Sequence, residues 1–342
     1  MSVVKFIVYS LIVTFISCKG LDLLRSVNQP DIITKINNMN TTWTAGHNSR
    51  FDNMTLKDVV RLLGVIETPK EMIVPRRESP ILQDLPENFD LREKWKQCES
   101  LFEIRDQSNC GSCWAFGAAE AMSDRICIKS GGILQTRVSA ENIVACCKTC
   151  GNGCKGGVPI AAWEYWRKNG IPSGGLYGDK QTCQPYSFPP CDHHINGTYG
   201  PCSIKYDTPQ CSQTCQNGKT VKEDLTFATT AYFVGYNEQS IMSDIYQNGS
   251  VEAVFSVYED LYNYKSGVYQ NVMGNYLGGH AIKIIGWGVE NGVKYWLAAN
   301  SWNEQWGDKG FFKILRGKNH VNIESNVTAG IPKIPTKFLL DQ

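Results

Sequence analysis

The 342-residue sequence lacks three features that would each indicate a class of function. It has almost no excess charge, since 34 Lys and Arg are balanced by 33 Asp and Glu, and so gives no electrostatic basis for binding nucleic acid or an anionic membrane surface. Beyond the first 20 residues, no apolar run approaches the length of a membrane-spanning helix. Internal repeats and low-complexity tracts are missing as well. These absences leave a globular chain, long enough for a large core in one domain or two closely packed lobes.

The first 18 residues have the pattern of a secretory signal peptide. One basic residue, Lys5, precedes an apolar run at residues 6–16 that is too short to span a bilayer. A buried first helix is the alternative interpretation. The secretory route predicts a lysosomal or extracellular glycoprotein, with acceptor sites at Asn40, Asn53, Asn196 and Asn248.

Cysteine is missing from the last 127 residues, although the chain has 14 cysteines. If Cys18 leaves with the signal peptide, thirteen remain. In an oxidising compartment most of them pair, so one thiol needs an explanation. Zinc is the alternative, because Cys110/Cys113 and Cys147/Cys150 have ligand-like spacing. The secretory route favours disulfides instead, and we expect no metal or other cofactor.

Residues 19–84 differ from the chain that follows. They contain no cysteine, show a helical pattern in "LKDVVRLLGVI", and end in a polar, Pro-bearing stretch. That stretch predicts an exposed linker with cleavable sites such as Arg76–Arg77. We interpret residues 19–84 as a propeptide and residues 85–342 as the mature domain; an N-terminal subdomain is the alternative.

Helical patterns precede strand patterns in the mature domain. An Ala-rich helix is expected over residues 113–129, and a second helix ends at Gly170. Residues 171–222 are rich in Pro, Gly and Cys and predict disulfide-linked loops. After about residue 225, segments alternate or run apolar between glycines, as strands do. This order predicts an α+β protein with two lobes.

Cys113 is the candidate nucleophile, in the segment "DQSNCGSCWAF". It is expected at the N-terminus of a helix, where unpaired N–H groups and the helix dipole lower the pKa of a thiol. Gly111 and Ser112 allow a tight turn before it, and the following N–H groups can face a reacting carbonyl oxygen.

The candidate base follows from the small number of histidines, which is five. His47 lies in the expected propeptide and would be removed. His193 and His194 lie in a loop between cysteines, and His320 in a polar turn near the C-terminus. His280, in "GGHAIKIIGWG", follows two glycines at the start of an apolar strand, where an imidazole can face a cleft. A core histidine is the alternative, but the lack of other candidates favours a catalytic base.

Three further residues have chemistry that suits this pair. Asn300 lies twenty residues after the histidine, and its amide oxygen can accept a ring N–H. Trp302 can cover that hydrogen bond and exclude water. Gln107 can direct its amide N–H groups at a developing oxyanion, although a surface Gln in a loop is the alternative.

From residue 85 to about residue 332, the sequence resembles the papain family of cysteine proteases, and within it the cathepsin B group. The resemblance depends on "DQSNCGSCWAF", "CCKTCGNGCKGG", "PPCDHHINGTYGPC", "GGHAIKIIGWG" and "NSWNEQWGDKGFF", with a weaker likeness at "WTAGHNSRF". The first segment fits the papain-type signature C-G-[SA]-C-[WY]. The resemblance implies a papain-like two-lobed α+β fold, with a helical left lobe, a β-barrel-like right lobe and a cleft between them.

The same resemblance implies acyl transfer to Cys113. Its thiolate attacks a peptide carbonyl, His280 protonates the leaving amine, and water hydrolyses the thioester. Gln107 and the Cys113 N–H stabilise the oxyanion. Gly156 and Gly157 expose a bare backbone edge on which substrate pairs as an extended strand.

An insert at about residues 189–207 resembles the occluding loop of the cathepsin B group. Its His193 and His194 are then expected to bind the free carboxylate of a substrate C-terminus, which favours removal of dipeptides. A surface histidine pair is the alternative. Asp106 is available to pair with His193.

The sequence departs from the group in ways that affect specificity. Ser108 stands where the family usually has Gly. Asn326 replaces an acid at the base of the S2 pocket, so we expect a P2 preference for apolar or aromatic residues and no glycan on this sequon. Tyr199 and Gln305 replace a charged pair that holds the loop, which predicts endopeptidase activity beside peptidyl-dipeptidase activity.

The resemblance also implies six disulfides and a set of partners. The pairs are Cys98–Cys127, Cys110–Cys154, Cys146–Cys211, Cys147–Cys150, Cys183–Cys215 and Cys191–Cys202. The expected partners are protein and peptide substrates, the chain's own propeptide as inhibitor and cystatin-type inhibitors, for a monomer without a membrane span after signal removal. The alternative is a non-catalytic secreted binding protein that retains the fold. Such proteins lose the Cys, the His or the Asn, and this chain has all three.

Overall fold

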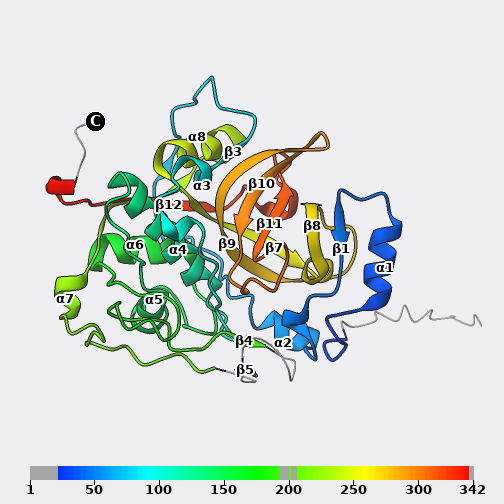
Figure 1. The fold of residues 1–342 in the computed structure, drawn as a ribbon, viewed down its shortest axis with the longest axis horizontal. Coiled ribbons are helices and arrows are strands. Elements are labelled where there is room, and N and C mark those ends of the chain that lie inside the picture. The colour runs from blue at the N-terminus through cyan, green and yellow to red at the C-terminus, as the bar shows by residue number, and fades with distance from the viewer. Residues whose placement is uncertain (1–21, 193–199, 202–205, 339–342) are drawn as a thin grey trace, which may run out of the picture.

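Helices gather on one side of the molecule and a large sheet on the other (Figure 1). The computed structural model describes residues 22–192, 200–201 and 206–338. The helical side contains α4 (Cys113–Lys129), α5 (Ala140–Cys146) and α6 (Pro159–Asn169), and Gly170 ends α6 with a φ of +76°. The predicted helix at 113–129 and the predicted helix end at Gly170 are therefore confirmed, as is the α+β class.

Helix α4 lies at the centre of the fold. Every residue from Cys113 to Ile128 is buried, and the helix packs against α6 and against strands of the sheet. Small residues let its neighbours approach from all sides, as expected for a helix buried all round. Its charged residues have partners: Asp124 pairs with Lys283 at 3.0 Å and Arg125 with Asp244 at 2.5 Å. Helix α4 thus joins the helical side to the sheet.

The main sheet has ten strands. Nine follow the order β1-β8-β11-β10-β9-β7-β12-β6-β2, and β3 (Phe89–Asp90) pairs with β9. The predicted strands after residue 225 are β6 (Ala228–Val234), β7 (Val251–Tyr258), β8 (Tyr264–Tyr269), β9 (Tyr276–Glu290), β10 (Val293–Ala299), β11 (Phe311–Leu315) and β12 (Val327–Pro332). The path has two ends, so this sheet is open. The expected barrel-like right lobe is wrong in that respect, because β1 and β2 do not pair with each other.

Short elements complete the described chain. They are α1 (Pro30–Asn38), β1 (Trp43–Ala45), α2 (Leu56–Val60), β2 (Arg76–Arg77), α3 (Leu91–Lys94), the pair β4 (Cys191–Asp192) and β5 (Gly200–Pro201), α7 (Val221–Asp224) and α8 (Glu238–Asn248). Both end strands of the main sheet come from the N-terminal 84 residues. Apolar residues of this N-terminal segment, among them Trp43 and Phe51, belong to the core of the sheet side.

One expectation about the N-terminal segment is wrong. Arg76 and Arg77 are half-buried and form β2, which pairs in parallel with β6, whereas the sequence predicted an exposed linker there. The unpaired edge of β6 offers backbone hydrogen bonds to any extended chain, and so a polar stretch becomes a strand.

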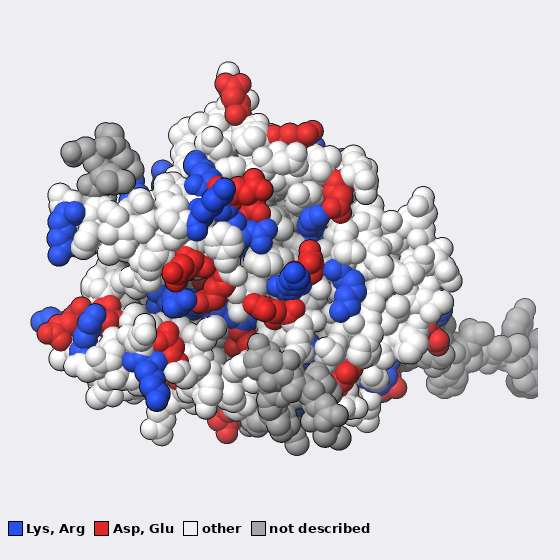
Figure 2. All heavy atoms as spheres, in the orientation of Figure 1, with Lys and Arg blue, Asp and Glu red and all other residues white. Residues whose placement is uncertain are grey.

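The surface agrees with the balanced composition. Figure 2 shows Lys and Arg interspersed with Asp and Glu, so neither sign dominates the face in view. None of the helices in the described part of the chain has the length and apolar character needed to cross a membrane.

Candidate active site

Cys113 is the first residue of α4 and the free cysteine among the described residues. Its sulfur is buried and accepts the Gly64 N–H at 3.2 Å. Burial raises the pKa of the Cys113 thiol to about 11, although N–H groups of Ala281, Gly64 and Trp114 act in the opposite direction. The lowered pKa expected from the helix terminus is therefore wrong for this state, because loss of water outweighs the nearby donors.

His280 lies on β9 with its ring fully buried. One ring nitrogen, Nε2, lies 2.8 Å from Asn300 Oδ1. The same oxygen accepts the Ser301 N–H at 2.8 Å, which fixes the amide orientation. His280 Nε2 must therefore donate, and Nδ1 keeps a lone pair that no described residue engages. Burial lowers the pKa of His280 to about 4, so the ring is neutral. A neutral imidazole with a free lone pair can accept the proton of a thiol.

An aromatic cluster covers the His280–Asn300 hydrogen bond. The Trp302 ring lies 4.6 Å from the His280 ring, and Tyr262 stacks on Trp302 at 5.2 Å. Phe51, from the N-terminal segment, packs edge-on against Trp302 at 5.5 Å. Trp302 is thus placed where the sequence predicted it, but shielding is shared with residues that no motif indicated.

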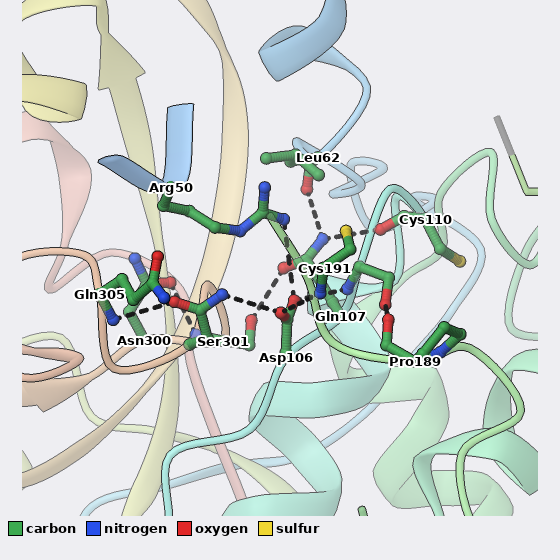
Figure 3. A network of polar contacts seen from close by, with 12 residues as sticks. Arg50, Leu62, Asp106, Gln107, Cys110, Pro189, Cys191, Asn300, Ser301 and Gln305 are labelled. Carbon is green, nitrogen blue, oxygen red and sulfur yellow. Dashed lines mark hydrogen bonds and ion pairs between the residues drawn. The ribbon is translucent and has the colours of Figure 1, made fainter. Parts of the chain in front are cut away.

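Gln107 is fixed by three hydrogen bonds of its side chain (Figure 3). Its Nε2 donates to the carbonyl oxygens of Leu62 at 2.9 Å and Cys110 at 2.7 Å, and its Oε1 accepts from Ser301 Oγ at 2.8 Å. One donor therefore already holds a carbonyl oxygen supplied by the N-terminal segment. Next to it, Ser108 has a φ of +53°, the left-handed region that favours glycine.

Residues 62–66 of the N-terminal segment run through the site as an extended chain. Gly157 donates its N–H to Gly64 O at 2.9 Å and accepts the Ile66 N–H at 2.8 Å, while the Val65 N–H donates to Gly279 O at 3.3 Å. Only glycine fits at position 64, since an added Cβ would lie 1.9 Å from Gly111 O. The Gly156–Gly157 edge thus pairs with an extended chain, and in this state that chain is the protein's own.

Asp106 is the hub of a second set of contacts (Figure 3). Its carboxylate accepts the Ser108 N–H at 2.7 Å, an Asn303 side-chain N–H at 3.0 Å and the Cys191 N–H at 3.4 Å. Arg50, buried in the N-terminal segment, forms an ion pair with it at 3.7 Å. Sequence reasoning missed Arg50, although it lies in "WTAGHNSRF", the stretch noted for its likeness. The expected histidine partners of this region, His193 and His194, lie outside the described residues, as does Tyr199.

Asn326 lies two strands from His280. Its carbonyl oxygen accepts the Val254 N–H at 3.1 Å, and Val254 is opposite Ala281 in the β7–β9 ladder. Its side-chain Oδ1 is buried and has no partner among the described residues. The position is therefore close to the cleft but uncharged.

Two buried carboxyl groups were not foreseen. Glu252 accepts from Trp163 Nε1 at 2.8 Å and Thr328 Oγ1 at 2.9 Å, and burial raises its pKa to about 8. Burial also raises the pKa of Glu120, on α4, to about 7. Only the charge pattern of α4 could have indicated them, since neither belongs to a motif.

Five of the six expected disulfides are present: Cys98–Cys127, Cys110–Cys154, Cys146–Cys211, Cys147–Cys150 and Cys183–Cys215. Cys191 is also disulfide-bonded, but its expected partner Cys202 lies outside the described residues. The cysteines with zinc-like spacing are therefore in disulfides, apart from Cys113.

Comparisons with known proteins agree with this arrangement. Residues 85–331 match "Papain family cysteine protease" and residues 28–69 match "Peptidase family C1 propeptide". A cathepsin B-like cysteine proteinase of Schistosoma japonicum is 51% identical over 298 residues, covering 85% of this chain and 86% of the relative. The cathepsin B-like cysteine proteinase 6 of Caenorhabditis elegans is 44% identical over 315 residues, covering 89% and 83%.

Solved structures give the same result. The procathepsin B S9 of Trypanosoma congolense superimposes with a TM-score of 0.79 at 38% identity, covering 91% of this chain and all of that one. A digestive procathepsin L2 of Tenebrio molitor, 23% identical with a TM-score of 0.68, shares the fold and covers 88% of this chain and 89% of that one. The chain belongs to the papain family of cysteine proteases, with cathepsin B-like relatives, and the structure shows its propeptide lying across the cleft.

Proposed function

We propose that removal of the propeptide releases a cysteine endopeptidase and peptidyl-dipeptidase that works through a Cys113 thioester. The observation that carries this proposal is the free Cys113 at the start of α4, in a cleft with the oriented His280–Asn300 pair, while Gln107 holds a peptide carbonyl. That is the set of groups needed for a nucleophile, a base, an orienting acceptor and an oxyanion donor.

The reaction has a simple proton balance. The Cys113 proton moves to His280 Nδ1, and the thiolate attacks the carbonyl carbon while Gln107 Nε2 and the Cys113 N–H receive the oxyanion. The protonated imidazole then gives its proton to the leaving amine. Water hydrolyses the thioester with His280 as base, which restores the thiol and releases the acyl group as a carboxylic acid.

Specificity is the finer part of the proposal. His193 and His194 are proposed to bind a substrate's terminal carboxylate, on the sequence of their loop alone. Asn326 is proposed to favour apolar or aromatic P2 residues, since its uncharged amide offers no counter-ion to Arg. The same proposal places the enzyme in the secretory pathway, in the lysosome or outside the cell.

Labelling and peptide cleavage test the function together. On the matured protein, a thiol-reactive epoxide should modify Cys113 and abolish hydrolysis of a blocked peptide substrate, and Cys113→Ala should be inactive. Dipeptides should be released faster from a peptide with a free C-terminus than from its amide. A Cys113→Ala enzyme as active as the wild type would refute the mechanism, whereas equal cleavage of acid and amide would refute only the peptidyl-dipeptidase activity.

A further inference from the structure

The chain between the cleft and the protease domain has two parts that differ in attachment. The second part, residues 74–82, is tied to the edge of β6. Arg76 pairs in parallel with Phe233, whose N–H donates to Pro75 O at 2.9 Å. The Gly235 N–H donates to Arg77 O at 3.1 Å. The backbone on both sides of the Arg76–Arg77 bond is therefore bound as a strand.

Side chains strengthen this attachment. The Arg76 guanidinium lies 3.5 Å from the centroid of the Tyr236 ring, a distance typical of a cation–π contact. Ser79 is buried, and its hydroxyl donates to the Asp244 carboxylate at 2.9 Å. A protease that binds its substrate as an extended strand would have to break these contacts before it could reach the dibasic pair.

The first part, residues 67–73, is held much less firmly. Within the described residues, its backbone makes one hydrogen bond, from the Met72 N–H to Pro69 O at 2.9 Å, which closes a turn. It belongs to no helix or strand, and Ile73 is 94% exposed. Lys70 and Glu71, at the turn, are both exposed. Exposed turns with few backbone hydrogen bonds are the preferred sites of proteolytic cleavage.

We propose that the first maturation cut falls within residues 67–73, at the Lys70–Glu71 bond for a trypsin-like protease, and that β2 protects Arg76–Arg77 at this stage. Hydrolysis consumes one water molecule. It leaves a carboxylate on Lys70 and a new amino terminus on Glu71.

This cut leaves the inhibitory contacts intact. The cleft residues 62–66 lie before it, and the hydrogen bonds that Gly64 and Ile66 make with Gly157 do not depend on the broken bond. Apolar residues of the propeptide also remain in the sheet-side core. The product is a latent two-chain form, in which residues 71–84 stay on the protease domain as an extension that still carries β2.

Limited trypsin digestion tests the position of the cut. The Cys113→Ala full chain should be treated briefly at neutral pH, and new termini between residues 22 and 190 identified by mass spectrometry. We expect a terminus at Glu71 before any terminus created at Arg76 or Arg77. A first cut at either arginine or elsewhere in that range, or no cut at all, would overturn the proposal.

A matched variant tests the protection by β2. Lys70→Gln removes the trypsin site without touching the strand, so cleavage at Arg76 or Arg77 should be at least about tenfold slower than cleavage at Lys70 in the parent chain. In that background, Tyr236→Ala should speed cleavage at Arg76. If the Lys70→Gln chain is cut at the arginines as fast as the parent is cut at Lys70, the strand gives no protection and the proposal fails.

Latency is measured on the chain that keeps Cys113. After trypsin cleavage and inhibition of trypsin, the two fragments should elute together in gel filtration, with less than about a tenth of the activity of the matured enzyme on a blocked peptide. Separation of the fragments or immediate full activity would overturn the latent intermediate. The activity readout rests on the proposed function, whereas the cleavage map and the elution do not, so the two failures are distinguishable.

Discussion

At the scale of single residues, Gln107 acts on both the reaction and the inhibition. Its amide orientation is fixed by Ser301 Oγ, and one of its N–H groups holds Leu62 O. The side chain therefore needs no rearrangement to receive an oxyanion once Leu62 leaves, and pre-oriented donors of this kind contribute strongly to the rate.

Replacing that donor should lower turnover with little change in KM. Gln107→Glu keeps the shape but puts a carboxylate where negative charge develops, so kcat should fall by about 10²- to 10³-fold. Ser301→Ala is the matched control, because it removes only the hydroxyl that orients the amide, and its loss should be smaller. Steady-state kinetics on the matured enzymes provide both numbers. A Gln107→Glu enzyme with kcat close to that of the wild type would contradict the assignment.

Asn326 gives a second prediction for a single residue. Its buried Oδ1 has no partner among the described residues, and an acid there would pair with a cationic P2 side chain. Asn326→Glu should therefore raise kcat/KM for Arg-at-P2 over Phe-at-P2 substrates by about tenfold, or roughly 1.4 kcal/mol. Asn326→Gln controls for size and should leave the ratio unchanged. If both variants give the wild-type ratio, Asn326 does not contact the P2 side chain.

The sequence could indicate the reacting residues because each lies in a short motif with its own chemistry. Cys113, His280 and Asn300 were identified in this way before any geometry was known. The pKa values could not be predicted, since burial of the Cys113 thiol depends on Gly64, which lies 49 residues earlier in the chain. The ion pair of Arg50 with Asp106 was missed for the same reason, because no local pattern connects residues so far apart.

At the scale of elements, residues 62–66 inhibit by shape as well as by hydrogen bonding. Position 64 has no room for a side chain, so Gly64→Ala should displace this segment and expose Cys113. We expect the unprocessed variant to react with a thiol-reactive epoxide about tenfold or more faster than the wild type, as a backbone clash of this size costs several kcal/mol.

The substitution Glu67→Ala, at an exposed position of the same propeptide, is the control and should react at the wild-type rate. Labelling is followed by mass spectrometry on intact chains, so that cleavage does not confuse the result. Equal rates for Gly64→Ala and the wild type would show that this segment does not limit access to the thiol.

The elements also show where sequence reasoning fails. Helix α4 was predicted with its observed bounds, because its Ala-rich pattern and its start after Gly-Ser are local signals. Strand β2 was missed, since two arginines have low strand propensity and form a strand here only because β6 has a free edge. An edge is a property of the assembled sheet and cannot be found in the segment that pairs with it.

At the scale of the whole molecule, the propeptide covers both ends of the main sheet. Strand β1 pairs with β8 at one end, and β2 pairs with β6 at the other. Complete maturation therefore exposes two strand edges while it opens the cleft. Exposed edges can pair with other chains, so stepwise removal of the propeptide keeps the β6 edge covered until the last cut.

Acid acts on the cleft and on the fold in opposite directions. The pKa of His280, lowered to about 4, means that the closed cleft holds a neutral ring, so its stability is lost as pH falls from about 6.5 towards 4. Opening lets water reach the ring and allows it to take up a proton. Apparent affinity for the propeptide should therefore weaken with falling pH in that window, by at most about tenfold per pH unit for one proton.

The buried glutamates have the reverse effect. The pKa values of Glu252 and Glu120 are raised from 4.5 to about 8 and about 7, so both carboxyls stay protonated in the fold. Their contribution to the free energy of unfolding is complete below about pH 4.5 and is lost as pH rises towards 8. The same acid that loosens the propeptide thus preserves the domain that it releases.

Replacing Glu252 should flatten this pH dependence. Glu252→Gln resembles the protonated acid in shape and can keep the hydrogen bonds from Trp163 and Thr328, so its melting temperature should fall by several degrees less than that of the wild type between pH 5 and pH 8. Calorimetry on Cys113→Ala chains avoids self-cleavage, and Glu93→Gln, at an exposed position, should follow the wild-type curve. If Glu252→Gln kept the full wild-type slope, the acid stability of the fold would have to come from other groups, since the carboxyl of Glu252 would then not lose its proton within the folded domain over this range.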